Sequence, residues 1–329
     1  MDPDQWFYWK IGGTVVALMV GAGVYYFWIR EPEAIIYKSG QIPMTKVSRR
    51  YRRTSKGIVT FVEPHLQIPL CLAEKTSLSH NVRKFRFALP SAHHVAGLEA
   101  CQHVRVSAEI DGKTVVRPYT PVSDDDLVGF VDIVVKIYKK SEKFPNGGAL
   151  SQYLDSLCVG DKINFRGPTF QHIYHGNGQF STGHTPANTP DKTRYAHFKR
   201  ISLIAGGTGI TPILQIMNKS LKDPDDKTEF ALLFGNQTQD DILLKNELDE
   251  IHEKHPSRFR VTHILSQPIP DQPWGGLTGY ITADPIRRTL FPVDPNTAFV
   301  ICGPPAMREK AVLPALQELG VDKDHIFVM

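Results

Sequence analysis

Three side chains with complementary chemistry lie within four residues of one another. Residues 117–123 read Arg-Pro-Tyr-Thr-Pro-Val-Ser, and Pro118 helps to stiffen the segment. A guanidinium matches phosphate oxygens through its planar fork, and an aromatic face beside a hydroxyl suits an isoalloxazine ring. Arg117, Tyr119 and Thr120 therefore predict a site for a flavin dinucleotide, with a plain strand-edge turn as the alternative.

A glycine pair follows in the segment Gly-Gly-Ala-Leu-Ser at 147–151. Gly147 and Gly148 leave backbone N–H groups accessible, and a helix with one apolar face is expected from Leu150 onward. The N-terminus of a helix attracts anions, and Ser151 adds a hydroxyl. This segment predicts the second half of a pyrophosphate cradle; a glycine turn with a serine cap is the alternative.

Short strands are expected to position these two segments. From residue 57 onward, alternating apolar and polar residues are divided by turn signals such as Asp111-Gly112. Strands at this spacing favour a small antiparallel β-barrel. We predict a flavin-binding barrel domain over residues 57–173. Its predicted strands are 58–62, 82–87, 104–110, 131–138 and 161–168.

A second glycine turn follows a short, almost wholly apolar run. Residues 199–205 predict a buried strand, and residues 206–212 read Gly-Gly-Thr-Gly-Ile-Thr-Pro before an apolar helix. Strand, glycine turn and helix are the layout of a nucleotide-binding βα unit, although the spacing is G-G-x-G rather than G-x-G-x-x-G. The pattern repeats, which predicts an α/β domain with a parallel sheet over residues 199–329. Further strands are predicted at 230–234, 259–265 and 297–302, with helices at 243–252 and through Leu313, Leu316 and Leu319.

Cys302 ends the last of these strands and is followed by Gly-Pro-Pro-Ala-Met. A buried structural cysteine is the common case, but ligands bind at the carboxyl ends of parallel strands. We therefore predict that Cys302 lies near the nicotinamide of a bound coenzyme. The four cysteines of the chain form no C-x-x-C pair, so no metal site, iron–sulfur cluster or disulfide framework is predicted.

The charge of the chain is concentrated near its N-terminus. Residues 30–56 carry eight Lys or Arg against two acidic residues, whereas residues 57–329 carry 29 basic and 30 acidic side chains. The main part of the chain therefore gives no electrostatic support for nucleic-acid binding. We interpret residues 31–56 as a basic juxtamembrane linker that either contacts anionic lipid or is simply solvated.

An uncharged segment of nineteen residues, 11–29, precedes this basic linker. As a helix it would be about 28 Å long, close to the hydrocarbon thickness of a bilayer, and aromatic residues flank both of its ends. We predict a transmembrane anchor over residues 1–30, with the catalytic domains on the cytosolic side. A cleaved signal peptide is the alternative.

Residues 174–198 are dense in Gly, Asn, Thr, Pro and His and predict an irregular linker or long surface loop. His172, His175 and His184 lie in or beside it. We interpret them as solvated loop histidines rather than metal ligands.

Six segments together resemble the NADH–cytochrome b5 reductases, within the ferredoxin–NADP reductase superfamily. They are R-P-Y-T-P-V-S at 117–123, F-V-D-I-V-V-K-I-Y at 130–138, G-G-A-L-S at 147–151, G-G-T-G-I-T-P at 206–212, L-L-F-G-N-Q-T at 232–238 and C-G-P-P-A-M at 302–307. Their order and spacing agree over residues 57–329, and the membrane anchor fits bound forms of the family.

The resemblance implies which residues contact FAD and NADH. Arg117 and Ser151 are expected to bind the FAD pyrophosphate. Tyr119 and Thr120 are expected to lie against the isoalloxazine, with Thr120 hydrogen-bonded near N5. The other implied FAD contacts are Pro118, Val134, Lys136, Tyr138, Gly147, Gly148, Leu150 and Thr211. The implied NADH contacts are Gly206, Gly207, Thr208, Gly209, Cys302, Gly303, Pro304, Pro305 and Met307.

Four positions depart from the family pattern. Relatives usually have Lys at Ala149, Met at Leu150 and a C-terminal Phe where this chain has Met329. Many relatives have Asp where Ser266 stands, and there Asp favours NADH by repelling the 2′-phosphate of NADPH. Ser266 therefore leaves use of NADPH open.

The resemblance implies a reductase that takes hydride from NADH on FAD and passes single electrons to cytochrome b5 or a similar haem protein. The alternatives are a related NAD(P)H flavoreductase with another haem or iron–sulfur acceptor, and a flavin-binding membrane scaffold without turnover. The anchor is compatible with the endoplasmic reticulum and with the mitochondrial outer membrane.

Overall fold

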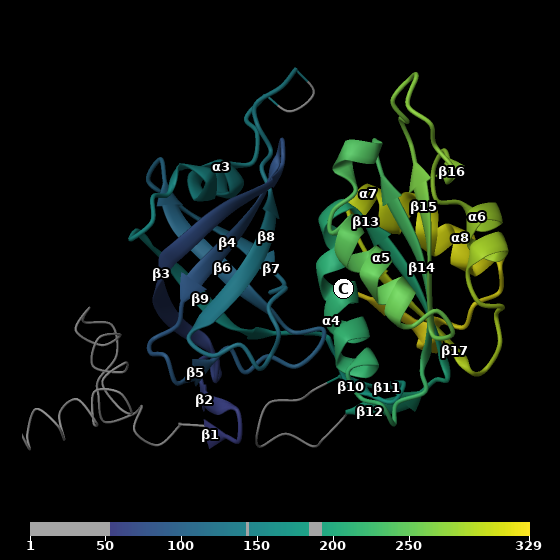
Figure 1. Ribbon diagram of the computed structural model, residues 1–329, viewed down its shortest axis with the longest axis horizontal. Helices are drawn as coiled ribbons and strands as arrows, with labels where there is room; N and C mark the ends of the chain where they lie inside the picture. Colours follow the sequence, from purple (N-terminus) through teal and green to yellow (C-terminus); the bar gives the residue numbers. More distant parts are fainter. Residues whose placement is uncertain (1–52, 143–144, 184–192) are drawn as a thin grey trace, which may run out of the picture.

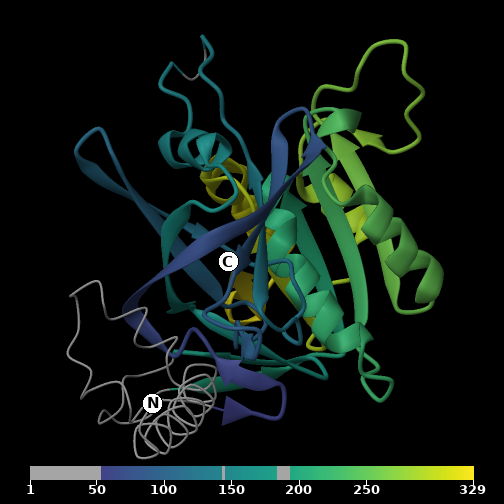
Figure 2. The same cartoon turned by 60° about the vertical axis from the view of Figure 1, so that its left-hand side comes forward.

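The computed structural model describes residues 53–142, 145–183 and 193–329. The predicted anchor and most of the basic linker lie outside the described residues, as does His184. Within these three ranges no helix is both long and apolar enough to cross a membrane. Figure 1 shows two domains side by side, the first coloured blue to teal and the second green to yellow, and Figure 2 shows them turned by 60°.

The first domain is built on a six-stranded antiparallel sheet, as the sequence predicts. The strands curl round a buried apolar cluster, so that the two end strands come close to each other. The Val122 amide, just after one end strand, donates a hydrogen bond of 2.9 Å to the carbonyl of Asp132 in the other end strand. In spatial order the strands are β7 (Lys113–Tyr119), β6 (His103–Ile110), β9 (Lys162–Thr169), β3 (Glu63–Ser79), β4 (Val82–Ala88) and β8 (Phe130–Lys136).

Alternation along the strands explains why one face of this sheet is buried. In β4, Phe85 and Phe87 are fully buried in this cluster, while Lys84, Arg86 and Ala88 are only partly buried. Phe87 packs edge-on against Phe165 of β9 with ring centroids 4.8 Å apart. The predicted helix is α3 (Ala149–Ser156), which packs its buried leucines on the same cluster. A small sheet of β1 (Arg53–Thr54), β2 (Gly57–Val59) and β5 (His94–Val95) lies at the start of the domain.

The second domain contains the predicted parallel sheet. Alternate residues of its central strand face two apolar clusters: Leu203 lies in one and Ile204 in the other. Helices α4 (Ile210–Leu221) and α5 (Lys245–Lys254) cover one face, and α6 (Ala283–Thr289) and α8 (Leu313–Glu318) cover the other (Figure 1). The strand order is β16 (Leu277–Thr278), β15 (Phe259–Leu265), β14 (Glu229–Asn236), β13 (Arg200–Gly206), β17 (Thr297–Cys302) and β18 (Ile326–Val328).

The structure differs from the irregular linker expected over residues 174–198. Here β10 (His172–Gly176), β11 (Gln179–Thr182) and β12 (Arg194–His197) form a three-stranded antiparallel sheet. Its physical basis is aromatic burial, because the Phe180 ring stacks on Phe327 of β18 with centroids 4.2 Å apart. Asn177 and Gly178, both with positive φ, make the turn between the first two strands.

One buried cluster crosses the boundary between the domains. Ala100, Cys101 and Val134 of the first domain belong to the same apolar cluster as Ile210 and Leu214 of α4. The two domains therefore share part of their core rather than meeting only through polar surfaces.

Candidate active site

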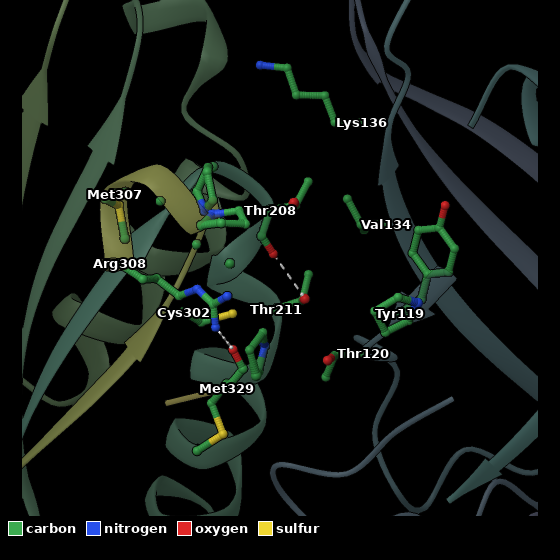
Figure 3. Close-up of a pocket in the computed structure, with 18 of the residues that line it drawn as sticks. Tyr119, Thr120, Val134, Lys136, Thr208, Thr211, Cys302, Met307, Arg308 and Met329 are labelled. Atoms are coloured by element: carbon green, nitrogen blue, oxygen red, sulfur yellow. Dashed lines mark hydrogen bonds between the residues drawn. The ribbon is translucent and has the colours of Figure 1, made fainter. Parts of the chain in front are cut away.

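A cavity of about 880 Å³ lies between the two domains. It brings together residues that are far apart in the sequence, from the R-P-Y-T segment to the C-G-P-P loop (Figure 3). Every residue predicted to contact FAD or NADH lines this cavity, with the exception of Gly147. Those lining residues are Arg117, Pro118, Tyr119, Thr120, Val134, Lys136, Tyr138, Gly148, Leu150, Ser151, Gly206, Gly207, Thr208, Gly209, Thr211, Cys302, Gly303, Pro304, Pro305 and Met307.

The R-P-Y-T segment forms one wall of the cavity. No strand was predicted over this segment, but Arg117, Pro118 and Tyr119 are the last residues of β7, paired with β6. Arg117 is exposed and donates a hydrogen bond from Nη1 to the Val116 carbonyl at 2.7 Å. Burial raises the pKa of Tyr119 to about 12, so the phenol stays neutral. Thr120 follows directly and faces the second domain across the cavity (Figure 3).

The N-terminus of α3 supplies backbone N–H donors to the same wall. Gly148 is its N-cap in an extended conformation, and among the described residues no side chain caps this end. The Ser151 hydroxyl donates to the Gly148 carbonyl at 2.9 Å and accepts from the Tyr138 amide at 3.1 Å. Uncapped N–H groups beside a guanidinium make this corner suitable for an anionic group.

Gly147 lies just outside the cavity and has a different role. Its φ is +60°, and a Cβ there would lie 2.6 Å from the Tyr138 carbonyl oxygen. Glycine is thus required for the turn that presents α3, because a side chain would be strained and would collide with backbone.

The opposite wall is the glycine turn of the second domain. β13 ends at Gly206, and η2 (Gly207–Gly209) leads directly into α4. A Cβ on Gly209 would lie 2.2 Å from the Cys302 carbonyl oxygen, and one on Gly206 would lie 2.5 Å from Met307 Sδ. These glycines allow the two loops at the carboxyl edge of the sheet to pack against each other.

Two further residues fix the geometry of this wall. Thr211 is buried and donates from Oγ1 to the Thr208 carbonyl at 3.1 Å, in the first turn of α4 (Figure 3). Cys302 lies at the end of β17, where burial raises the pKa of its thiol to about 11. The thiol is therefore protonated at neutral pH and is suited to packing rather than to nucleophilic attack.

Asn236 lines the cavity and was not singled out as a site residue from the sequence. It is 9% exposed, and neither its side-chain oxygen nor its nitrogen finds a hydrogen-bond partner among the described residues. An unpaired buried amide is costly unless a ligand or water satisfies it. The available signals were its place two residues after the predicted strand 230–234 and within the resembling segment 232–238. Tyr280, Arg308, Val328 and Met329 also line the cavity and were not predicted as contacts.

The residues present fit a flavin dinucleotide and a nicotinamide dinucleotide. One wall offers a guanidinium, uncapped N–H groups and an aromatic ring; the other offers a glycine turn and an unpaired amide at the carboxyl ends of parallel strands. In the part of the chain that is described, no group of three or more His, Cys, Asp or Glu side chains is arranged to hold a metal ion.

Two family models match the two domains in order. Residues 69–174 match the oxidoreductase FAD-binding domain, and residues 203–312 match the oxidoreductase NAD-binding domain. The chain therefore has an FAD-binding domain followed by an NAD-binding domain.

Similar proteins extend this match over most of the chain. NADH-cytochrome b5 reductase 2 of Danio rerio is 46% identical over 270 residues, which cover 80% of this chain and 85% of that protein. NADH-cytochrome b5 reductase 1 of Homo sapiens is 45% identical over 278 residues, which cover 84% of this chain and 90% of that protein. The chain belongs to the NADH-cytochrome b5 reductase family.

Solved structures agree with this assignment. The cytochrome b5 reductase domain of Ulva prolifera nitrate reductase matches with a TM-score of 0.75 and 36% identity, covering 82% of this chain and all of that one. The CS-b5R domains of human Ncb5or match with a TM-score of 0.60 at 24% identity and so support the fold alone. The family resemblance expected from the six segments is confirmed.

Proposed function

We propose that this reductase takes hydride from NADH on FAD and passes the electrons one at a time to cytochrome b5. Family membership supports the activity. The single observation that carries the proposal is the cavity between the domains, because the flavin-type and nicotinamide-type residues line one continuous space. FAD supplies the chemistry by accepting a hydride and releasing single electrons, and the protein positions the reactants.

The residues of the two walls have distinct proposed roles. Arg117 and the N–H groups of α3, beside Ser151, bind the FAD pyrophosphate, while Tyr119 and Thr120 orient the isoalloxazine. Cys302, as a neutral thiol, packs against the nicotinamide and aligns it with the flavin. Hydride transfer itself needs no general acid or base, which agrees with the protonated state of Cys302.

The decisive experiment follows the flavin absorbance of the purified full-length protein under anaerobic conditions. We expect NADH to bleach the flavin rapidly and added cytochrome b5 to restore it by two successive one-electron steps. If NADH bleaches the flavin but cytochrome b5 does not reoxidise it, cytochrome b5 is not the acceptor, and the NADH-dependent reductase activity still stands. A flavin that NADH cannot bleach would contradict the reductase activity and favour a flavin-binding scaffold.

The coenzyme preference is the second question for the same experiment. Ser266 and Tyr280 line the cavity at the end where β15 and β16 finish, and neither carries a negative charge. We propose that NADH is the main reductant and that the protein also uses NADPH at lower efficiency. Use of NADPH is expected because no carboxylate at position 266 repels its 2′-phosphate. Equal exclusion of NADPH in this protein and in Ser266→Asp would contradict this role of Ser266.

We propose that cytochrome b5 docks through an acidic haem rim on Lys and Arg side chains near the flavin edge. Attraction between exposed charges is screened by salt, so the rate of cytochrome b5 reduction should fall as ionic strength rises. A rate that does not change with salt would contradict electrostatic steering.

We also propose that residues 1–30 anchor the protein in a membrane, with residues 57–173 and 199–329 as cytosolic catalytic domains. The uncharged segment 11–29 and the basic residues that follow it support this proposal. The full-length protein should stay with membranes after alkaline carbonate extraction, whereas release into the supernatant would contradict the anchor. The endoplasmic reticulum and the mitochondrial outer membrane are the two proposed locations, and fluorescence co-localisation distinguishes them.

A further inference from the structure

An ion pair spans the cavity from one domain to the other. Lys136 Nζ, at the end of β8, lies 2.8 Å from Asp241 Oδ1 in η3 (Gln239–Asp241) of the second domain. The two side chains are 20% and 9% exposed, and both line the cavity. Figure 3 shows Lys136 extending from the first domain toward the second above the other labelled residues.

Asp241 is held in place independently of Lys136. Its Oδ2 accepts hydrogen bonds from Thr238 Oγ1 at 2.9 Å and from the Thr238 amide at 3.2 Å, and the second of these is one half of the capping box of η3. Burial favours the neutral carboxyl, but hydrogen bonds from Lys136 and Thr238 outweigh it and the pKa of Asp241 is lowered. A carboxylate fixed through one oxygen presents the other oxygen to Lys136 in a constant position.

Lys136 has a special place in the cavity. Of the described residues that line it, Lys136 is the one lysine, in addition to Arg105, Arg117 and Arg308, and Asp241 is the one Asp or Glu. A nicotinamide dinucleotide carries two phosphates and must cross this space to reach the flavin wall. An ammonium group that is already oriented loses less conformational freedom on binding an anion than one on a free four-carbon chain.

Other contacts between the domains lie elsewhere. Gln215 of α4 accepts from the Cys101 amide at 3.0 Å and donates to the Pro121 carbonyl at 3.2 Å. Lys222 pairs with Asp124 at 2.6 Å, but both side chains are about half exposed. Gln215, Lys222 and Asp124 line a second, smaller cavity, so these contacts can maintain the domain arrangement without Asp241.

We propose that Asp241 is a positioning residue for the reductant: it acts through Lys136, for which the resemblance implied a contact with FAD, by holding its ammonium group in the cavity for the pyrophosphate of NADH. This inference rests on the proposed function. Asp241 does not touch the reacting atoms; its effect should therefore appear in the concentration of NADH needed and not in the chemistry of hydride transfer.

The test uses the full-length, FAD-loaded protein and stopped-flow bleaching of the flavin by NADH. Asp241→Asn keeps an oxygen for Thr238 but removes the charge, and Lys136→Met removes the ammonium. We expect each variant to raise the half-saturating NADH concentration about tenfold, with the limiting bleaching rate changed less than about twofold. In the Lys136→Met background, adding Asp241→Asn should have an effect below about twofold, because both act through one pair.

Lys222→Met is the matched control, since it removes an interdomain ion pair outside the cavity. We expect its half-saturating concentration to stay within about twofold of the parent. If one cavity variant fails to fold, as judged by lost flavin and a lower Tm, the other still removes the same pair.

The inference is overturned if Asp241→Asn leaves NADH saturation unchanged while NADH bleaches the parent. It is also overturned if the two cavity substitutions are independent, or if Lys222→Met has an equal effect. A parent protein that NADH does not bleach would overturn the proposed function as well, so the two failures are distinguishable.

Discussion

The two glycine turns that form opposite walls of the cavity use glycine for different reasons. Gly147 needs it because of its own positive φ and the neighbouring Tyr138 carbonyl, which lies nearby in the sequence. Gly209 needs it because the Cys302 carbonyl, from a loop far along the chain, lies where a Cβ would be. The first turn is a local requirement, whereas the second joins two distant loops. Substitutions should therefore damage folding at the first turn and catalysis at the second.

The largest expected effect is at Gly209. In Gly209→Ala the Cβ would lie 2.2 Å from the Cys302 carbonyl oxygen and would displace Cys302. A displacement of about 1 Å at a reacting centre costs about 100-fold in rate. We expect NADH to bleach the flavin about 100-fold more slowly while FAD remains bound. The control is Gly275→Ala, because no atom lies within 4 Å of a Cβ placed there. Equal bleaching rates in the two variants would contradict the contrast between the turns.

A second test moves to the flavin wall. Arg117→Met removes the guanidinium next to the uncapped end of α3, and losing charge-assisted hydrogen bonds should weaken FAD binding by about 10- to 100-fold. Fluorescence titration of the apoprotein with FAD measures this. Lys113→Met, at the exposed start of the same strand, is the control and should bind FAD normally. Unchanged FAD affinity in Arg117→Met would show that Arg117 does not bind the FAD pyrophosphate.

A third test isolates the local requirement at Gly147. Gly147→Ala should lower the free energy of unfolding by about 1–3 kcal/mol, from the positive φ together with the contact with Tyr138. Gly112→Ala is the matched control, because Gly112 has a similar φ of +70° but no atom within 4 Å of a Cβ. Chemical denaturation of both variants separates the backbone strain from the collision. A smaller loss in Gly147→Ala than in Gly112→Ala would contradict this explanation.

The smallest expected effect concerns the pH dependence of stability at Cys302. Burial raises its folded pKa from 9.0 to about 11, so the unfolded chain loses this proton first. The contribution to stability is fully present below pH 9 and is lost as pH rises through 11, by about 1 kcal/mol at pH 10. Cys302→Ala should remove this part of the alkaline slope in denaturation curves, whereas Cys158→Ala, at an exposed thiol, should not. Identical slopes for the parent and Cys302→Ala would contradict a raised pKa of the Cys302 thiol.

Local patterns predicted most of the fold and residues on both walls of the site. The alternation in β4 and β6, the helix after Gly148 and the βα unit at Gly206 depend on neighbours in the sequence, so their periodicity was visible. The sheet of residues 172–197 was missed because turn-forming residues outnumber its apolar ones. The Asn177-Gly178 pair was nevertheless a hairpin signal.

Non-local pairings could not be predicted from the sequence. Asp241 is an ordinary acidic residue in a turn until the fold brings it to Lys136. The unpaired amide of Asn236 and the approach of Gly209 to Cys302 likewise depend on strands that pair far along the chain. The six resembling segments include Gly209, Asn236 and Cys302 but not Asp241, and they do not give the contacts between these residues and distant parts of the chain.

The apolar cluster that crosses the domain boundary has a consequence for cooperativity. Since Ala100, Cys101 and Val134 share buried contacts with α4, separating the domains would expose hydrocarbon surface to water on both sides. The protein should therefore melt in a single calorimetric transition, although it is built from two recognisable halves. A ligand that binds either half then raises the melting temperature of the whole molecule, and loss of FAD from one wall makes the distant coenzyme wall easier to unfold.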